Sequence, residues 1–323
     1  MKRILSGVQA TGKIHIGNYF GAIKQFVDLG KDNDAYYMIA DLHSITTVQD
    51  KEELKENIFD VALDYLALGI DPEKSVIFRQ SQIPAHTDLT WIFNCITTMP
   101  YLMRAHAFKD AEAKAKEVNV GLFDYPVLMA SDILLYSPDL VPVGKDQKQH
   151  VEYARDIAEK FNRIYGDTFK LPEEYILQDV AIVAGIDGRK MSKSYGNHIP
   201  LFAERNEIEK LVMSIVTDSK TPEETKSTEG DTLFTLHSLV SDKETLDKVR
   251  TGYENGGLGY GETKKMLVES MDSFIAPLRE KRRELVKDRD YVLGVLEEGA
   301  NKARNVARLK MQEVKEKIGL ILE

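Results

Sequence analysis

The sequence predicts an α/β fold, in which helices cover a parallel sheet, followed by a region made only of helices. Strand-like and helix-like stretches alternate through the first half of the chain, a pattern that is typical of a parallel sheet. After Ser194 the strand pattern disappears. With 323 residues, 43% of them hydrophobic, the chain is long enough to bury one large core or two modest ones.

Four short apolar runs are the predicted strands of the sheet. They lie at residues 3–5, 35–40, 75–80 and 140–143. Apolar residues recur every three or four positions from Leu54 to Tyr65, so a helix is predicted over residues 51–68. Gly69 and the Asp71-Pro72 pair end this helix.

Helical spacing dominates the second half of the chain. Helices are predicted over residues 204–218, 242–253, 261–287 and 291–318, with a looser stretch over 221–231. The sequence therefore predicts a helical second domain from about Tyr195 to Lys287.

A short basic segment, Lys190-Met191-Ser192-Lys193-Ser194, carries the strongest functional signal. It follows Gly185-Ile186-Asp187-Gly188, which favours a turn, so its lysines are expected on a loop. Two movable cations among hydroxyl groups suit an oligophosphate whose charge grows in a transition state. Most pentamers of lysine and serine are only solvated basic loops, so this interpretation depends on a second segment.

The second segment runs from Gln9 to Asn18 and joins the first predicted strand to a helix start. A strand, a glycine turn and a helix start present free backbone N–H groups to anionic oxygens. Gly17 leaves room for an adenine to pack against the backbone. His15 and Asn18 fall on one face of a helical turn, and both can donate to phosphate or ribose oxygens.

A P-loop is the alternative for this part of the chain. Residues 7–13 match the pattern GxxxxGK, but the next residue is Ile14. A P-loop needs a serine or threonine at that place to bind Mg²⁺. The residues therefore disfavour a P-loop.

The string His15-Ile16-Gly17-Asn18 and the later Lys190–Ser194 segment together resemble the signature pair of class I aminoacyl-tRNA synthetases. Residues 125–136 and 141–150 resemble the amino-acid pocket and ribose-binding segments of the bacterial tryptophanyl-tRNA synthetases. The resemblance runs from Ile4 to the C-terminal helices. It implies a Rossmann-like catalytic domain over residues 1–194 and an inserted all-helical anticodon-binding domain over 195–287. Residues 288–323 would form a C-terminal helix that packs back towards the catalytic domain.

The resemblance implies ATP-dependent attachment of L-tryptophan to tRNA(Trp) through a tryptophanyl-adenylate. Magnesium would be carried by ATP, and the protein would be a homodimer. Lys190, Lys193 and Gln9 would be the catalytic residues. The residues that the resemblance assigns to ATP are Gln9, Ala10, Thr11, His15, Gly17, Asn18, Gly144, Lys145, Asp146, Ile182, Lys190, Met191, Ser192, Lys193 and Ser194.

Asp132 lies in a helix that is apolar on nearly every side, where a lone carboxylate is costly to bury without a donor. On the residues alone, a structural pairing with a core donor is equally good, and His43 is better explained as a structural histidine. The resemblance implies that Asp132 accepts the indole N–H of tryptophan and that His43 lies beside the ring. The tryptophan residues that it implies are Asp132, Leu5, His43, Tyr125, Met129, Val141, Val143 and Gln147.

Three other functions share parts of this pattern. A tyrosine-specific synthetase would carry a tyrosine in place of Leu5, and a cofactor-forming nucleotidyltransferase would not need the helical second half. A non-catalytic RNA-binding relative would not need the intact Lys190–Ser194 segment. One departure from the family is Ala111, where a phosphate-binding lysine is usual; Lys109 or Lys114 is the candidate substitute.

Composition limits the remaining possibilities. The formal net charge of −9 argues against a generally basic nucleic-acid surface, so RNA contacts would come from local patches. The candidate patches are Lys281–Arg283 with Lys287 and Arg289, and Arg304, Arg308 and Lys310 on the last helix. Solvated faces paired with glutamates are the favoured explanation of both patches. The single cysteine, Cys95, excludes a disulfide framework, an iron–sulfur cluster and a cysteine zinc site. Without a signal-like or membrane-spanning apolar run, a cytoplasmic protein without membrane association is expected.

Overall fold

The computed structural model describes residues 1–105, 108–109, 119–144, 147–175 and 183–322. It divides into two compact units, each made of segments that are distant in the sequence. The first unit contains Met1–Gly12, Gln25–Gln178 and Asp288–Glu323, and the second contains Lys13–Lys24 and Asp179–Lys287.

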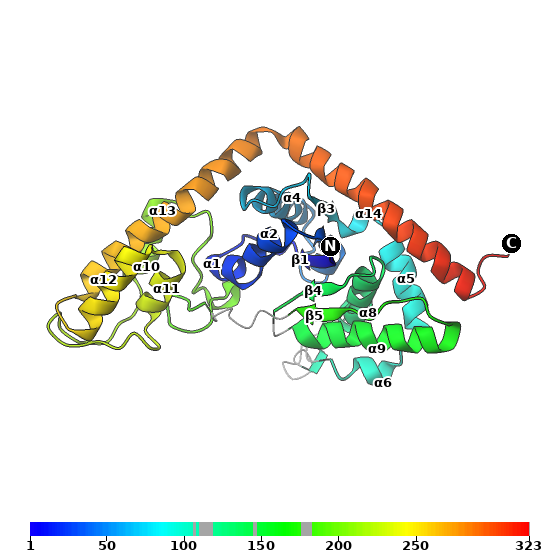
Figure 1. Ribbon diagram of the computed structural model, residues 1–323, viewed down its shortest axis with the longest axis horizontal. Helices are drawn as coiled ribbons and strands as arrows, with labels where there is room; N and C mark the ends of the chain where they lie inside the picture. Colours follow the sequence, from blue (N-terminus) through cyan, green and yellow to red (C-terminus); the bar gives the residue numbers. More distant parts are fainter. Residues whose placement is uncertain (106–107, 110–118, 145–146, 176–182, 323) are drawn as a thin grey trace. The chain divides into compact units, whose positions relative to one another are not determined.

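A five-stranded parallel sheet forms the centre of the first unit (Figure 1). Its strands are β1 (Arg3–Val8), β2 (Asp34–Ile39), β3 (Ser75–Arg79), β4 (Leu140–Pro142) and β5 (Glu173–Tyr175). The strand order β3-β2-β1-β4-β5 is that of a Rossmann-like sheet, so the predicted α/β class is confirmed. The four predicted strands are present, whereas the short β5 was not predicted.

Helices of the first unit pack around this sheet. They are α2 (Lys24–Gly30), α3 (Asp41–Ser44), α4 (Lys51–Ala67), α5 (Ala85–Asn94), α6 (Met99–Leu102), α8 (Val120–Leu134), α9 (Lys148–Tyr165) and α14 (Arg289–Lys317), with the 3₁₀ turn η2 (Gln80–Gln82). The helix predicted over 51–68 is α4. It begins where the Asp50 carboxylate accepts from the backbone N–H groups of Glu52 and Glu53.

The long helix α14 lies directly against β3 (Figure 1). Three small residues of α14, Ala300, Ala303 and Ala307, are fully buried. A Cβ atom on Gly299 would lie only 1.8 Å from the carbonyl oxygen of Ile77 in β3. Glycine is therefore required at this position because the helix backbone approaches the strand backbone so closely.

Helices make up most of the second unit. They are α1 (Ile16–Asn18), the π-helical η1 (Tyr19–Ile23), the 3₁₀ turn η4 (Lys193–Tyr195), α10 (Arg205–Met213), α11 (Thr232–Val240), α12 (Lys243–Glu254) and α13 (Tyr260–Lys287). Residues 195–322, all of them described, contain no strand, as predicted. The helix predicted over 204–218 ends earlier, and α11 was not predicted.

The compact units do not divide the chain at the boundary expected near residue 194. Residues 13–24 and 183–194 belong to the unit that holds α10–α13. Residues 288–323, which were expected to pack towards the catalytic domain, belong to the unit that holds the sheet. Backbone hydrogen bonds explain the place of residues 13–24: Ile16 N–H donates to the Ile199 carbonyl at 3.0 Å, and Leu201 N–H donates to the Ile14 carbonyl at 3.0 Å. These bonds join the two segments within one unit. Among the described helices, none combines the length and apolar character needed to cross a bilayer.

Candidate functional site

Asp132 is the centre of a buried hydrogen-bond network in the first unit. Its carboxylate, on α8, is almost inaccessible to solvent. His43 Nε2 lies 2.7 Å from Oδ2, and His86 Nδ1 lies 2.6 Å from Oδ1. Gln80 Nε2 donates to both oxygens at 2.8 and 2.9 Å. Asp132 is thus paired with donors in the core, as expected if its role is structural.

This network keeps Asp132 ionised despite its burial. Burial alone would raise the pKa of the carboxyl, but the neighbouring His86 and His43 outweigh it and lower the pKa to about 2. A carboxylate has about four lone-pair sites, and these donors make four contacts with it, two on each oxygen. A further donor would therefore have to replace one of the two Gln80 contacts.

Sequence reasoning missed the other members of the network. Gln80 and His86 are fully buried, and the hydroxyl of Tyr136 lies 2.9 Å from His86 Nε2. The Gln80 side-chain oxygen also accepts from Leu42 N–H at 3.1 Å, which ties α3 to the network. The available signal was the position of Gln80, directly after a parallel strand, where polar side chains reach the ligand-binding edge of such sheets.

Tyr125 and Gln147, both predicted from the resemblance, are joined by His150. The Tyr125 hydroxyl lies 2.7 Å from His150 Nε2, and Gln147 Oε1 lies 2.8 Å from His150 Nδ1. The rings of Tyr125 and His43 are 6.2 Å apart in an edge-on arrangement. Since His43 contacts Asp132, the polar residues predicted for tryptophan form one connected set. His150 was not predicted, although it follows Gln147 at helical spacing.

The apolar residues predicted for the tryptophan pocket belong to one hydrophobic cluster. Leu5 on β1 and Val141 on β4 are buried in it, and Met129 and Val143 pack against it half-buried. The strands of Leu5 and Val141, β1 and β4, are neighbours in the sheet. All eight predicted tryptophan residues thus lie in the first unit: the four polar residues belong to one connected set, and the four apolar residues belong to one hydrophobic cluster.

The end of β1 carries three of the residues predicted for ATP. Ala10 is buried, and its N–H donates to the Ser44 hydroxyl at 2.8 Å. Gln9 is exposed and Thr11 is half-buried. These three residues follow the central strand of the parallel sheet at its carboxyl end, where such sheets bind ligands.

In the second unit, His15 and Asn18 cap the start of α1 reciprocally. His15 Nδ1 accepts from Asn18 N–H at 3.3 Å, and Asn18 Oδ1 accepts from His15 N–H at 3.1 Å. Burial, followed by the charges of His198 and Lys193, lowers the pKa of His15 to about 4. His15 is therefore neutral at pH 7. Because its Nδ1 accepts a hydrogen bond, its proton is assigned to Nε2.

The two signature segments meet in this unit. Gly17 N–H donates to the Met191 sulfur at 3.4 Å, and a Cβ on Gly17 would lie 2.9 Å from His15 Nδ1 and 3.3 Å from the Met191 Cβ. Gly17 is thus constrained by close packing inside the protein. Met191 is buried, whereas Lys190, Lys193 and Ser194 are exposed and Ser192 is half-buried.

A tight hairpin over residues 183–191 carries Lys190, and Lys193 follows it at the start of η4. Met191 N–H donates to the Val183 carbonyl at 2.8 Å and Gly185 N–H donates to the Arg189 carbonyl at 2.7 Å, with Gly188 at a φ of +78°. The predicted turn at 185–188 is therefore confirmed. Partial desolvation lowers the pKa of the Lys193 ammonium, although the residue as a whole is exposed.

Several predicted residues lie outside the described part of the chain. They are Lys145, Asp146 and Ile182 of the predicted ATP site, together with Ala111 and Lys114. Gly144 is described and half-buried, and its carbonyl accepts from Gln147 N–H at 2.9 Å. Lys109 is described and exposed.

The basic patches make contacts within the protein. Arg283 pairs with Glu204 and Glu280, and Lys310 pairs with Glu313 at 2.7 Å. The Arg289 guanidinium lies over the Phe59 ring, 4.0 Å from its centroid. These contacts agree with the favoured explanation of solvated, paired faces.

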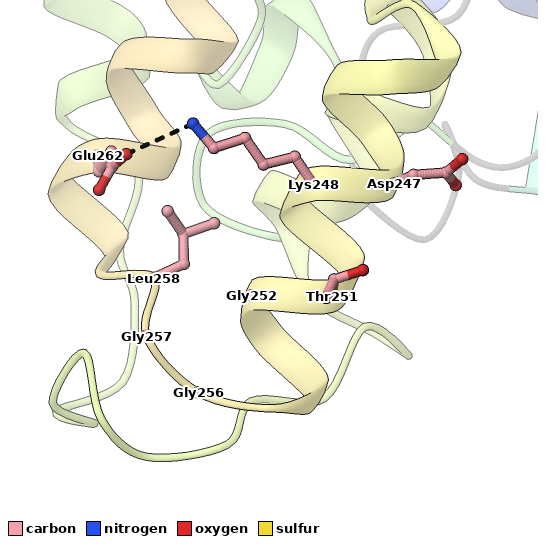
Figure 2. A pocket seen from close by; sticks show the side chains of 8 residues that line it. All are labelled: Asp247, Lys248, Thr251, Gly252, Gly256, Gly257, Leu258 and Glu262. Atoms are coloured by element: carbon pink, nitrogen blue, oxygen red, sulfur yellow. Dashed lines mark ion pairs between the residues drawn. The ribbon is translucent and has the colours of Figure 1, made fainter.

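An open groove lies at the end of α12 in the second unit (Figure 2). Figure 2 shows Lys248 and Glu262 facing each other across it, with 3.8 Å between Nζ and Oε1. The backbone of Gly256 and Gly257 forms one edge and Leu258 contributes an apolar surface. None of the residues predicted for ATP or tryptophan lines this groove.

Comparison with known proteins agrees with this geometry. The family model for tRNA synthetases class I (W and Y) matches residues 1–276. A tryptophan–tRNA ligase of Fusobacterium nucleatum is 51% identical over 322 residues, which cover 99% of each chain. One of Rhodopirellula baltica is 49% identical over 318 residues, covering 98% of this chain and 99% of that protein.

The fold is similar to a solved structure over nearly the whole chain. The tryptophanyl-tRNA synthetase of Campylobacter jejuni, complexed with ADP and tryptophan, superimposes with a TM-score of 0.92 at 46% identity. The match covers 98% of this chain and 99% of that one. On the family match and these full-length similarities, the chain belongs to the class I tRNA synthetases of the W and Y family.

Proposed function

We propose that this protein is a tryptophan–tRNA ligase, which uses ATP to attach L-tryptophan to tRNA(Trp) through a tryptophanyl-adenylate. The observation that carries the proposal is the meeting of the two signature segments in one unit, where Gly17 contacts Met191 and Ile16 bonds Ile199. Similarity to tryptophan–tRNA ligases over 98–99% of the chain supports the substrate. ADP and tryptophan in the Campylobacter relative support both ligands.

In the first step the tryptophan carboxylate attacks the α-phosphorus of ATP. A bond forms between the carboxylate oxygen and the α-phosphorus, and the bond from that phosphorus to the β-phosphate oxygen breaks, releasing pyrophosphate. Lys190 and Lys193 meet the negative charge that develops on the phosphates. Neutral His15, with its proton on Nε2, donates to a phosphate oxygen without bringing a charge of its own. In the second step a ribose hydroxyl of the terminal adenosine of tRNA attacks the acyl carbon; the ester bond forms, the bond from that carbon to the phosphate oxygen breaks, and AMP leaves.

Asp132 selects tryptophan by accepting its indole N–H in place of one of the two Gln80 contacts. His43, Gln80 and His86 fix the carboxylate in place, so it does not need to reorganise when the substrate binds. Phenylalanine has no N–H to offer, so it would displace a Gln80 contact without replacing it, and the site disfavours it. Tyrosine is disfavoured because Leu5 offers its phenol no polar partner.

Further features of the proposal concern the rest of the molecule. Magnesium enters with ATP, held by the phosphate oxygens. The helical segment 195–287 binds the anticodon, and the groove at Lys248 is the place to begin testing that contact. The protein is a cytoplasmic homodimer.

Exchange of pyrophosphate into ATP, measured with each proteinogenic amino acid in turn, tests the proposal. Exchange with tryptophan alone is the expected result. Exchange with tyrosine would contradict the roles of Asp132 and Leu5. Absence of exchange with every amino acid, in the presence and absence of tRNA, would leave a non-catalytic relative as the better interpretation.

A further inference from the structure

Asn197 lies three residues beyond the lysine segment and is almost fully buried, with 2% of its surface exposed. Its Oδ1 accepts from Ser192 N–H at 2.8 Å. Its Nδ2 donates to Asp187 Oδ1 at 2.7 Å and to the Lys190 carbonyl at 3.1 Å. One side chain therefore binds the turn before the lysines and the backbone on both sides of Met191.

The backbone of Asn197 adds a fourth link to the same hairpin. Its carbonyl accepts from Ile186 N–H at 3.0 Å. A Cβ on Gly185 would lie 2.4 Å from both Cγ and Nδ2 of Asn197. The space that glycine leaves at position 185 is thus filled by this amide, which explains why the turn packs so tightly against it.

Only a short side chain with both a donor and an acceptor can make these contacts. Aspartate at position 197 would keep the acceptor for Ser192 but lose both donated bonds. Its carboxylate would also replace the Nδ2 group that now donates to Asp187 Oδ1, so two carboxylates would lie next to each other. The bond from Asn197 is the main reason that the pKa of Asp187 is lowered, so Asp187 is ionised and would repel a second carboxylate.

We propose that Asn197 is a positioning residue for adenylate formation: it fixes the backbone of residues 190–192 and thereby sets where the ammonium groups of Lys190 and Lys193 meet the phosphates. This inference rests on the proposed function. It assigns Asn197 no contact with substrate. A displacement of a charged group by about 1 Å can lower a rate by about a hundredfold, so a single buried amide can control the chemical step.

The test compares Asn197→Asp with a matched control, Asn162→Asp. Asn162 also binds a turn through both ends of its amide: Oδ1 accepts from Thr168 N–H and Phe169 N–H, and Nδ2 donates to the Phe169 carbonyl. It lies in the first unit, whereas the lysine segment belongs to the second. For each variant, kcat and KM in tryptophan-dependent pyrophosphate exchange are measured, together with tryptophan binding by equilibrium dialysis and a thermal melt.

Asn197→Asp should lower kcat by about tenfold to a hundredfold and change tryptophan binding by less than about twofold. Asn162→Asp should leave kcat unchanged. Gly185→Ala, which pushes the Asn197 amide away without replacing it, should reproduce the loss of kcat and covers the case in which Asn197→Asp folds poorly. Unchanged kcat in a folded Asn197→Asp or Gly185→Ala protein would overturn the inference, as would an equal loss in Asn162→Asp. Absence of exchange in the unaltered protein would instead count against the proposed function.

Discussion

His86 Nδ1 lies 2.6 Å from Asp132 Oδ1, with both side chains buried in the first unit. The other ring nitrogen of His86 contacts the Tyr136 hydroxyl, so the imidazole bridges the carboxylate and a phenol. This arrangement gives His86 one consistent assignment when neutral: Nδ1 donates to Asp132 and Nε2 accepts from Tyr136. His86, which is itself held by Tyr136, therefore fixes one oxygen of the Asp132 carboxylate, and His43 fixes the other.

Removal of His86 should destabilise the first unit. His86→Ala leaves a buried carboxylate short of a donor and opens a cavity, so the free energy of unfolding should fall by about 2–4 kcal/mol. Tyr136→Phe removes only the outer hydrogen bond and should cost about 1 kcal/mol. Urea denaturation of the full chain measures both values. Equal effects of the two changes would contradict the central position of Asp132 in the network.

Asp132→Asn should impair the selection of tryptophan and leave ATP unaffected. The amide keeps the size of the carboxylate but loses its charge and one acceptor, so the indole loses its partner. The KM for tryptophan in pyrophosphate exchange should rise by roughly tenfold to a hundredfold, while the KM for ATP stays within about twofold. An unchanged preference among amino acids would remove Asp132 from the pocket.

His15 should make stability depend on pH between its unfolded and folded pKa values. Burial, with help from His198 and Lys193, lowers its pKa from 6.5 to about 4. The unfolded chain therefore binds a proton that the folded chain rejects, and the stabilisation present above pH 6.5 is lost as the pH falls towards 4. At the lower end the loss should approach about 3 kcal/mol.

The comparison with His15→Gln isolates this effect from other titrating groups. The free energy of unfolding is measured for both proteins at pH 7 and pH 5. The unaltered protein should lose more stability between these values than the variant. Equal losses would show that His15 does not titrate as its surroundings indicate.

Two glycines on α14 should respond oppositely to alanine. Gly299→Ala drives a methyl group into the Ile77 carbonyl and should destabilise the first unit by about 2 kcal/mol or more. Gly294 is exposed with open space around its Cβ position, so Gly294→Ala should stabilise the helix by up to about 1 kcal/mol. Urea denaturation measures whether each change lowers or raises the free energy of unfolding. A neutral Gly299→Ala would contradict the close contact of α14 with β3.

The sequence was a good guide where function or periodicity leaves a local pattern. The alternation of strands and helices predicted the parallel sheet, and the spacing of apolar residues predicted α4, α12, α13 and α14. Helix α11 was not predicted because several of its residues prefer strands. Tertiary packing determined its conformation instead. Its only local signal was Asp231, whose carboxylate accepts from Phe234 N–H at the helix start.

Residues that act through contacts distant in the sequence were harder to find. His86 and Gln80 are separated from Asp132 by 46 and 52 positions, and only the packing of α5 and η2 against α8 brings them together. Asn197 is close to the lysine segment in sequence, yet nothing in its surroundings indicates that its amide turns back to residues 187–192. The core donors agree with the structural pairing considered for Asp132, and a contact with the substrate requires the indole N–H to replace one of the two Gln80 contacts.

The most direct test of the central claim is aminoacylation of a tRNA(Trp) transcript by the purified protein with radiolabelled tryptophan or tyrosine. The proposed function predicts that tryptophan is esterified to the tRNA, that tyrosine is not, and that Lys193→Ala abolishes most of the rate while tryptophan still binds. Charging with tyrosine, or binding of tRNA without charging by either amino acid, would contradict it.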